Sequence, residues 1–248
     1  MSTPYNGNNM DDDLRSTWSH RSWTLAVSSG ILPSLTTSVF LAASSGSFAS
    51  LAGAACAAFA VYSFADLATG LYHWAIDNYG DAATPLFGAQ IQAFQGHHRR
   101  PYGIVRRELC NNLHVAAQAA AVALPAADAA LYAAGVPAAA HVFADVLAAC
   151  LVLSQQFHAW AHERPRRLPR AVAAMQAAGV LLSREQHAGH HRPPYDANYC
   201  IISGMWNGVL DGFKVFRGLE KVIYLCTYRH PAAVMGQTGR QVDGARYR

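Results

Sequence analysis

Charged residues are scarce in this sequence, and one long stretch has none. Only 14% of the residues are charged and 52% are hydrophobic, whereas soluble domains carry about 25% charged residues. No Asp, Glu, Lys or Arg occurs between Trp23 and Ala65. One crossing of a bilayer needs about 20 apolar residues, so this stretch is long enough for two spans. The composition argues against an ordinary soluble domain and favours a membrane protein.

Two apolar blocks predict two hairpins of membrane-spanning helices. The first hairpin covers 24–43 and 50–71, with a turn of small polar residues at 44–47. The second block runs from Leu113 to Ala161 and is interrupted at 135–137. Because this block is rich in weakly apolar alanine, a soluble helical bundle is the alternative. We expect an all-α membrane protein with about four transmembrane helices.

Motifs for disulfide frameworks, zinc ribbons and zinc proteases are absent. The five cysteines are scattered, odd in number and never spaced CxxC. The string HAWAH lacks the glutamate of the zinc-protease motif HExxH. Carboxylates are scarce near the histidines, which argues against a ferritin-like, Glu-rich di-iron site. The modest net charge of +4 comes from arginine clusters in loops, and it indicates membrane topology rather than nucleic-acid binding.

Histidines recur near the ends of the predicted spans. The segment 187–191 places three of them at i, i+3 and i+4, so on a helix they would share one face and converge on one point. His158 and His162 have i, i+4 spacing where the second hairpin ends. His97 and His98 would point about 100° apart on a helix, so we expect them to serve different metals or different shells.

Together these motifs predict a centre with two metals. Eight imidazole nitrogens are too many for one four-coordinate zinc and suit two non-haem irons with open positions. The predicted metal ligands are His73, His97, His98, His158, His162, His187, His190 and His191.

Six further residues are candidates for supporting roles. Hydrogen bonds to the imidazoles could come from Asp66, Asp77, Asn112 and Asp211. Ordinary solvation or helix capping is the alternative for these four. A lipid phosphate could bind the arginines that flank the last histidine motif, Arg184 and Arg192.

Charge asymmetry predicts the orientation of the spans. The arginine clusters lie at the same span ends as the histidines, whereas the turns at 44–47 and 135–137 contain no Lys or Arg. The positive-inside rule therefore places the histidines on the cytoplasmic or stromal face of the membrane. We expect a flexible polar segment at 1–22, a membrane domain at 23–226 and a polar tail at 227–248.

Four sequence strings resemble a known family. They are GLYHWAIDNYGD, PLFGAQIQAFQGHH, HAWAH and SREQHAGHHRPPYDANYCIISGMWN. They closely resemble the plant plastid fatty acid desaturase 4 proteins and are more distantly similar to plasmanylethanolamine desaturases. The likeness extends from Leu14 to about Tyr224. In that family eight histidines are taken as di-iron ligands, and they fall on the eight positions above. The resemblance implies no catalytic side chain beyond these ligands.

The resemblance also implies a reaction. It suggests a chloroplast enzyme, in the thylakoid membrane, that introduces a trans double bond at carbon 3 of the palmitoyl chain of phosphatidylglycerol. It would use O₂ and two electrons from ferredoxin. The alternatives are an endoplasmic reticulum location, a di-iron lipid hydroxylase and a vinyl-ether-forming plasmanyl desaturase. A non-catalytic membrane protein whose histidines bind metal is the alternative from another class.

Overall fold

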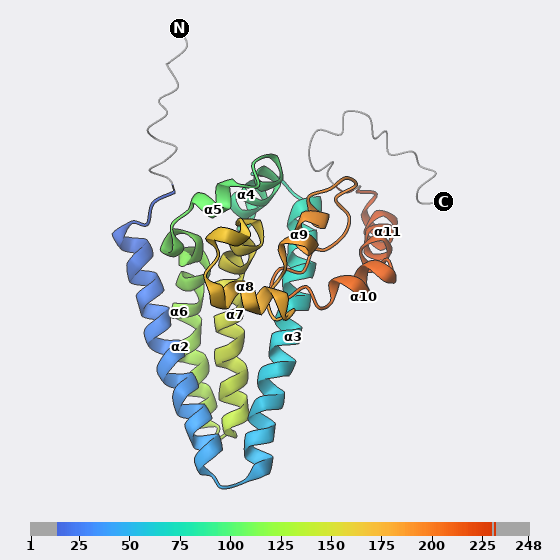
Figure 1. Cartoon of the computed structure of the whole chain (residues 1–248). Helices are drawn as coiled ribbons and strands as arrows, with labels where there is room; N and C mark the ends of the chain where they lie inside the picture. Colours follow the sequence, from blue (N-terminus) through green and yellow to red (C-terminus); the bar gives the residue numbers. More distant parts are fainter. Residues whose placement is uncertain (1–13, 230, 232–248) are drawn as a thin grey trace. The chain divides into compact units, whose positions relative to one another are not determined.

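The computed structural model describes residues 14–229 and residue 231. Within these residues the regular secondary structure is helical, with no strand (Figure 1). The chain forms two compact units. The first unit comprises the residues up to Ala65 and Ile104–Ala159, and the second comprises Asp66–Gly103 and the residues from Trp160 onward. The N-terminal end and most of the C-terminal tail of the predicted domain division lie outside the described residues.

Four helices are long and apolar enough to cross a membrane, as the sequence predicted. They are α2 (Trp18–Ser44), α3 (Phe48–Asn78), α6 (Leu109–Ala133) and α7 (Ala138–His162). Each is longer than the apolar stretch that predicted it, because polar residues continue the helix beyond the apolar part. Helices α3 and α7 run from one unit into the other. His73, which follows the predicted span 50–71, lies inside α3 because that helix continues to Asn78.

Helix α2 begins earlier than predicted because its first turn is capped. The Thr17 hydroxyl accepts a hydrogen bond from the His20 backbone N–H at 3.2 Å, and His20 Nδ1 accepts from the Thr17 N–H at 3.3 Å. This reciprocal pair is a capping box. Residues 18–22, which we expected to be flexible, are helical. The His20 ring also stacks on His114, with ring centroids 3.9 Å apart.

The first unit has an apolar core between its spans. Helices α2 and α6 lie side by side (Figure 1). Their contact buries Val27 and Ile31 of α2 against Leu113 and Ala117 of α6. The turns of both hairpins lie at the same end of this unit, the lower end in Figure 1. That arrangement is the one that two consecutive helical hairpins require.

Short helices and loops make up most of the second unit. Their bounds are α4 (Gly88–Arg99), η1 (Pro165–Arg167), α8 (Arg170–Ala177), α9 (Arg184–His190), α10 (Asn207–Gly212) and α11 (Val215–Thr227), while α5 (Gly103–Arg106) lies at the boundary between the units. Helix α8 has 8 residues, too few to cross a membrane.

A loop before α10 is bonded to the last part of α3. The carboxylate of Asp66, which is 0% exposed, accepts backbone hydrogen bonds from Ser203 at 2.8 Å and Gly204 at 3.0 Å. It accepts two more, from Ile202 at 3.1 Å and Trp206 at 3.4 Å. A buried carboxylate is stable only when its oxygens are hydrogen-bonded, and backbone donors satisfy it here. Asp66 therefore fixes this loop against α3.

Candidate metal centre

Histidines of the second unit gather in two neighbouring groups. In the first group, His162 at the end of α7 lies between His97 of α4 and His187 of α9. The His162 Nε2 is 2.9 Å from the Nε2 of His97 and 2.8 Å from that of His187. His191, just after α9, brings its Nε2 to 3.2 Å from that of His187. Four imidazole nitrogens therefore face one another.

The second group is built around a carboxylate. Asp77 and His73 lie one helical turn apart near the end of α3, with Oδ2 and Nε2 3.2 Å apart. The same Oδ2 lies 2.9 Å from the Nε2 of His98 and 3.4 Å from that of His190. The four ligand atoms of this group, three nitrogens and one oxygen, lie within 4.8 Å of one another.

Burial lowers the pKa of several of these imidazoles, among them those of His97, His187, His190 and His191. Burial, and then the neighbouring imidazoles of His162 and His98, lower the pKa of His97 to about 2. Burial and His73 lower the pKa of His190 to about 4, although Asp77 opposes the shift. Burial also lowers the pKa of His187 and His191. Neutral imidazole is the form that binds metals.

Two backbone carbonyls determine which nitrogen of two rings carries the proton. His73 Nδ1 lies 2.9 Å from the carbonyl oxygen of Tyr199, and His190 Nδ1 lies 2.9 Å from that of Ala197. A carbonyl oxygen can only accept, so each Nδ1 carries a hydrogen, and in the neutral ring each Nε2 then presents a lone pair. Both lone pairs face the Asp77 carboxylate, which is also an acceptor. Acceptors that face one another at this distance repel unless a proton or a cation lies between them.

The spacing of these atoms fits a metal ion. Adjacent ligand atoms that each lie roughly 2.1 Å from one ion are about 3.0 Å apart in an octahedral arrangement and about 3.4 Å apart in a tetrahedral one. The short contacts described above run from 2.8 to 3.4 Å. Imidazole and carboxylate together suit iron, zinc or manganese, so the donor atoms do not select one metal by themselves.

The predicted ligands fall into two groups in a way that differs from the expectation. We expected the three histidines of segment 187–191 to converge on one point. Instead His187 and His191 belong to the first group and His190 to the second. Helix geometry explains this, because positions i and i+4 point about 40° apart, whereas consecutive positions point about 100° apart. The same rule sends His97 and His98 to different groups.

His158 lies in the first unit, four residues before His162 on the same helix. Side chains at i and i+4 share a helix face, so the spacing directs both imidazoles the same way. His158 is buried, with 1% of its surface exposed.

Of the predicted supporting residues, Asp77 lies against imidazoles, as expected. Its Oδ2 contacts three histidines of the second group, so the carboxylate is also placed to join them as a ligand. Its spacing from His73, i and i+4 on one helix, was a signal for direct participation.

Asp66, Asp211 and Asn112 form hydrogen bonds with groups other than imidazoles. Asp66 accepts backbone N–H groups, and Asp211 accepts the N–H of Asn198 at 3.0 Å. Burial raises the pKa of Asp211. The Asn112 amide donates to Gln156 at 3.2 Å, so it neither caps a helix nor contacts an imidazole. Each of these three side chains therefore has a backbone or amide partner rather than an imidazole.

Arg184 holds two parts of the second unit together. Its Nη1 donates to the carbonyl of His162 at 2.7 Å and to that of Glu163 at 2.9 Å. The guanidinium therefore caps the end of α7 and keeps the start of α9 beside it. This contact explains why His187 lies against His162. Arg192, the other candidate for a lipid phosphate, is exposed.

Comparisons with known proteins find related sequences. The family model described as the lipid desaturase domain matches residues 62–234. The chain is 49% identical to "Fatty acid desaturase 4, chloroplastic" of Arabidopsis thaliana over 84% of its own length and 62% of that protein. It is 44% identical to "Fatty acid desaturase 4-like 1, chloroplastic" of the same plant, over 90% of this chain and 73% of the relative.

A more distant relative is the plasmanylethanolamine desaturase of Myxococcus xanthus. It is 30% identical over 66% of this chain and 58% of its own length. The chain thus spans less than two thirds of some of the relatives that it matches. No solved structure matches it.

Proposed function

Since this chain belongs to the lipid desaturase domain family, we propose that it is a membrane acyl-lipid desaturase whose buried histidines hold two iron ions. The reaction is a trans desaturation at carbon 3 of the palmitoyl chain of phosphatidylglycerol, in a chloroplast membrane such as the thylakoid. The similarity to two chloroplastic desaturases of Arabidopsis thaliana supports this substrate class and location. The functional domain is the predicted membrane domain, 23–226.

One observation carries the proposal for metal binding. The lone pairs of His73 and His190 face the Asp77 carboxylate at 3.2 and 3.4 Å. His73, His98, His190 and Asp77 are the ligands of one iron. The other is bound by the first group, His97, His162, His187 and His191, with His158 added by its helix spacing. One carboxylate among nine ligands makes this centre rich in nitrogen.

When bound, the irons would supply reduction of O₂ and removal of hydrogen from the acyl chain. The protein's own residues prepare that chemistry. Carbonyls of Tyr199 and Ala197 orient two imidazoles, and Asp77 supplies negative charge to one site. His73, His187 and His190 are fully buried, so bulk water is excluded on that side.

The reaction requires an external reductant. Reduction of O₂ to two water molecules takes four electrons and four protons, and formation of one carbon–carbon double bond supplies two of each. Two electrons must therefore come from a donor protein, and ferredoxin is the one we propose.

An exposed basic segment next to the centre suits an acidic electron donor. It begins two residues after His162 and contains Arg164, Arg166, Arg167 and Arg170, all exposed. Charge complementarity of this kind speeds the encounter of redox partners. A donor docked here would lie close to a metal ligand, which shortens the path for electrons.

The proposal is tested by expressing the chain in a host that supplies ferredoxin and phosphatidylglycerol. Fatty acids released from phosphatidylglycerol are identified by gas chromatography and mass spectrometry, and iron per purified chain is measured in parallel. We expect a trans-monounsaturated sixteen-carbon acid with the unaltered chain and none with His187→Ala. Absence of the acid with iron bound would redirect the search to other lipids, and absence of both would contradict the di-iron proposal.

A vinyl-ether-forming desaturase is the second candidate. The 30% identity to the plasmanylethanolamine desaturase of Myxococcus xanthus favours it. Product analysis separates the two functions, because a vinyl ether releases an aldehyde in acid whereas an unsaturated acyl ester does not.

A further inference from the structure

Polar side chains gather inside the first unit, near the end that carries both hairpin turns. Asp145 of α7 is 0% exposed and accepts a hydrogen bond from the Ser34 hydroxyl of α2 at 2.9 Å. One turn earlier on α7, His141 is 5% exposed and its ring lies 4.3 Å from that of Tyr132. Ionisable groups within membrane spans are costly and usually serve binding or transport. The metal centre uses none of these residues.

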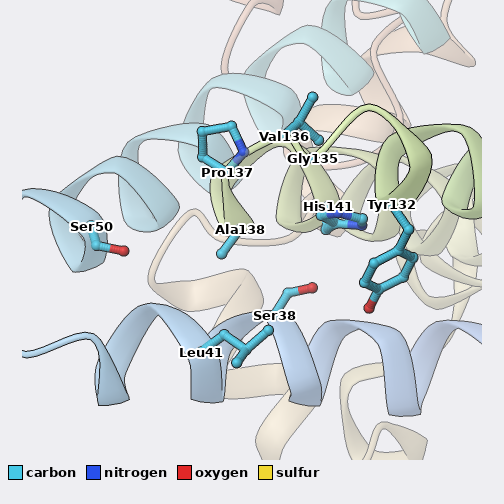
Figure 2. Close-up of a pocket in the computed structure, with 9 residues that line it drawn as sticks. All are labelled: Ser38, Leu41, Ser50, Tyr132, Gly135, Val136, Pro137, Ala138 and His141. Carbon is cyan, nitrogen blue, oxygen red and sulfur yellow. The ribbon is translucent and has the colours of Figure 1, made fainter.

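A pocket lies beside this cluster. Its volume is about 320 Å³, within the range of small-molecule sites. Figure 2 shows His141, Tyr132 and Ser38 on its wall, with Ser50 across from them and the turn around Pro137 closing one side. Leu41 lines the pocket as well; its side chain is 50% exposed and that of Tyr132 is 55% exposed. The wall therefore combines hydroxyl and imidazole groups with apolar surface that faces lipid.

Two buried polar atoms of the cluster are without a hydrogen-bond partner among the described residues. They are Nδ1 of His141 and Oδ1 of Asp145. A buried polar atom without a partner costs about 1 to 3 kcal/mol, so a ligand that supplies donors would be stabilised here. His141 lines the pocket directly, and Asp145 lies one helical turn beyond it.

The charge around the pocket indicates what kind of ligand it accepts. Neither hairpin turn contains a Lys or Arg, and the pocket lining contains none either. The ionisable side chains on these helices nearby are Asp128, Asp145 and His141. A phosphate headgroup would meet carboxylates and no cation, whereas sugar hydroxyls could donate to imidazole and hydroxyl acceptors.

We propose that this pocket binds the headgroup of a neutral, hydroxyl-bearing glycerolipid, with the acyl chains lying along the apolar wall. The site lies at the end of the spans that carries the turns, whereas the histidines of α3 and α7 lie toward the other ends of those helices. The bound lipid is therefore a structural or regulatory lipid rather than the substrate.

The test measures which lipid the purified full-length protein retains. The protein is incubated in detergent with equal amounts of monoglucosyl dioleoylglycerol, dioleoylphosphatidylcholine and dioleoylphosphatidylglycerol, and bound lipid is counted by native mass spectrometry. Ser50→Leu fills the pocket from a partly exposed helix position, and His141→Phe removes the imidazole. Ser29→Leu makes the same change as the first variant on the exposed face of α2 and serves as its matched control.

We expect the glucosyl lipid to be retained in excess over phosphatidylcholine. Ser50→Leu removes space and His141→Phe removes a hydrogen-bonding group, so each should weaken that retention roughly tenfold. Ser29→Leu should leave the retention unchanged. If His141→Phe does not fold, Ser50→Leu decides. Equal retention of the glucosyl lipid and phosphatidylcholine by the unaltered chain, or unchanged retention in Ser50→Leu, would overturn the proposal.

Discussion

The Nδ1 of His73 lies 2.9 Å from the backbone carbonyl oxygen of Tyr199, and the two rings meet edge to face with centroids 5.7 Å apart. The two residues lie far apart in the chain, on α3 and in the loop before α10. The Tyr199 hydroxyl also donates to the Tyr195 carbonyl at 2.8 Å, and it accepts from the Asn78 amide at 3.1 Å. The loop that carries Tyr199 therefore sets the orientation of a metal-facing imidazole, and it is itself fixed to α3.

Replacing Asp77 with asparagine should empty one metal site. The carboxylate oxygen lies within 3.4 Å of three imidazole nitrogens, and asparagine removes its negative charge while keeping its shape. We expect iron content to fall from about two to about one per chain and desaturation to be lost. Elemental analysis of the purified protein measures the first effect. Glu185→Gln changes an exposed carboxylate on α9 and should retain both irons. Full iron content in Asp77→Asn would show that this carboxylate is not a ligand.

We expect His158 to behave as a metal ligand, as its helix spacing indicates. Its i, i+4 relation to His162 directs both imidazoles to one side of α7. We expect His158→Ala to lower iron affinity by roughly 10- to 100-fold and to abolish product formation. His114→Ala is the control, because that ring bonds the Asn111 carbonyl at 2.8 Å. Iron binding that is equal in both variants would remove His158 from the site.

Asp66 should be required for folding rather than for chemistry. Alanine at this position leaves four backbone N–H groups without their acceptor. We expect Asp66→Ala to lose roughly 3 kcal/mol of unfolding free energy, and Asp66→Asn to lose less because its amide oxygen still accepts. Thermal unfolding in detergent measures both. Wild-type stability combined with lost activity in Asp66→Ala would instead indicate a catalytic role.

We expect a side chain at position 70 to destabilise the protein as long as residue 200 is cysteine. A Cβ at position 70 would collide with the Cys200 Sγ and come within 3.4 Å of its backbone. Overpacking of this kind costs about 1 to 3 kcal/mol, so Gly70→Ala should lower the unfolding temperature. The double variant Gly70→Ala/Cys200→Ala should recover part of the loss, because the sulfur is gone. Additive effects of the two substitutions would contradict direct contact.

The basic segment should determine how well the electron donor binds. Reversing charge in Arg166→Glu/Arg167→Glu should raise the KM for ferredoxin at low salt and weaken its salt dependence, because complementary charge steers the encounter. Iron content should not change, since neither side chain contacts an imidazole. Steady-state assays with varied ferredoxin at two ionic strengths measure this. An unchanged KM would exclude the segment as the docking site.

Part of this molecule was predictable from the sequence because it depends on local order. Apolar stretches with polar turns predicted the four candidate spans, and those spans are present. Local spacing also suggested that His97 and His98 would point apart. Capping was missed at Thr17 and His20, although the spacing Thr-x-x-His is local and could have indicated it.

The tertiary structure decided which residues meet. Helices α4 and α9 and the Tyr199 loop are separated from α3 in the sequence, yet they pack at its end. The hydrophobic periodicity of the sequence does not specify such contacts. For that reason Asp77, rather than Asp66, faces the histidines, although both lie on one stripe of α3. Asp66 meets a loop rich in N–H donors, whereas Asp77 meets imidazoles that α4 and α9 carry. Local helix geometry determines the direction of a side chain, and only long-range packing determines what it contacts.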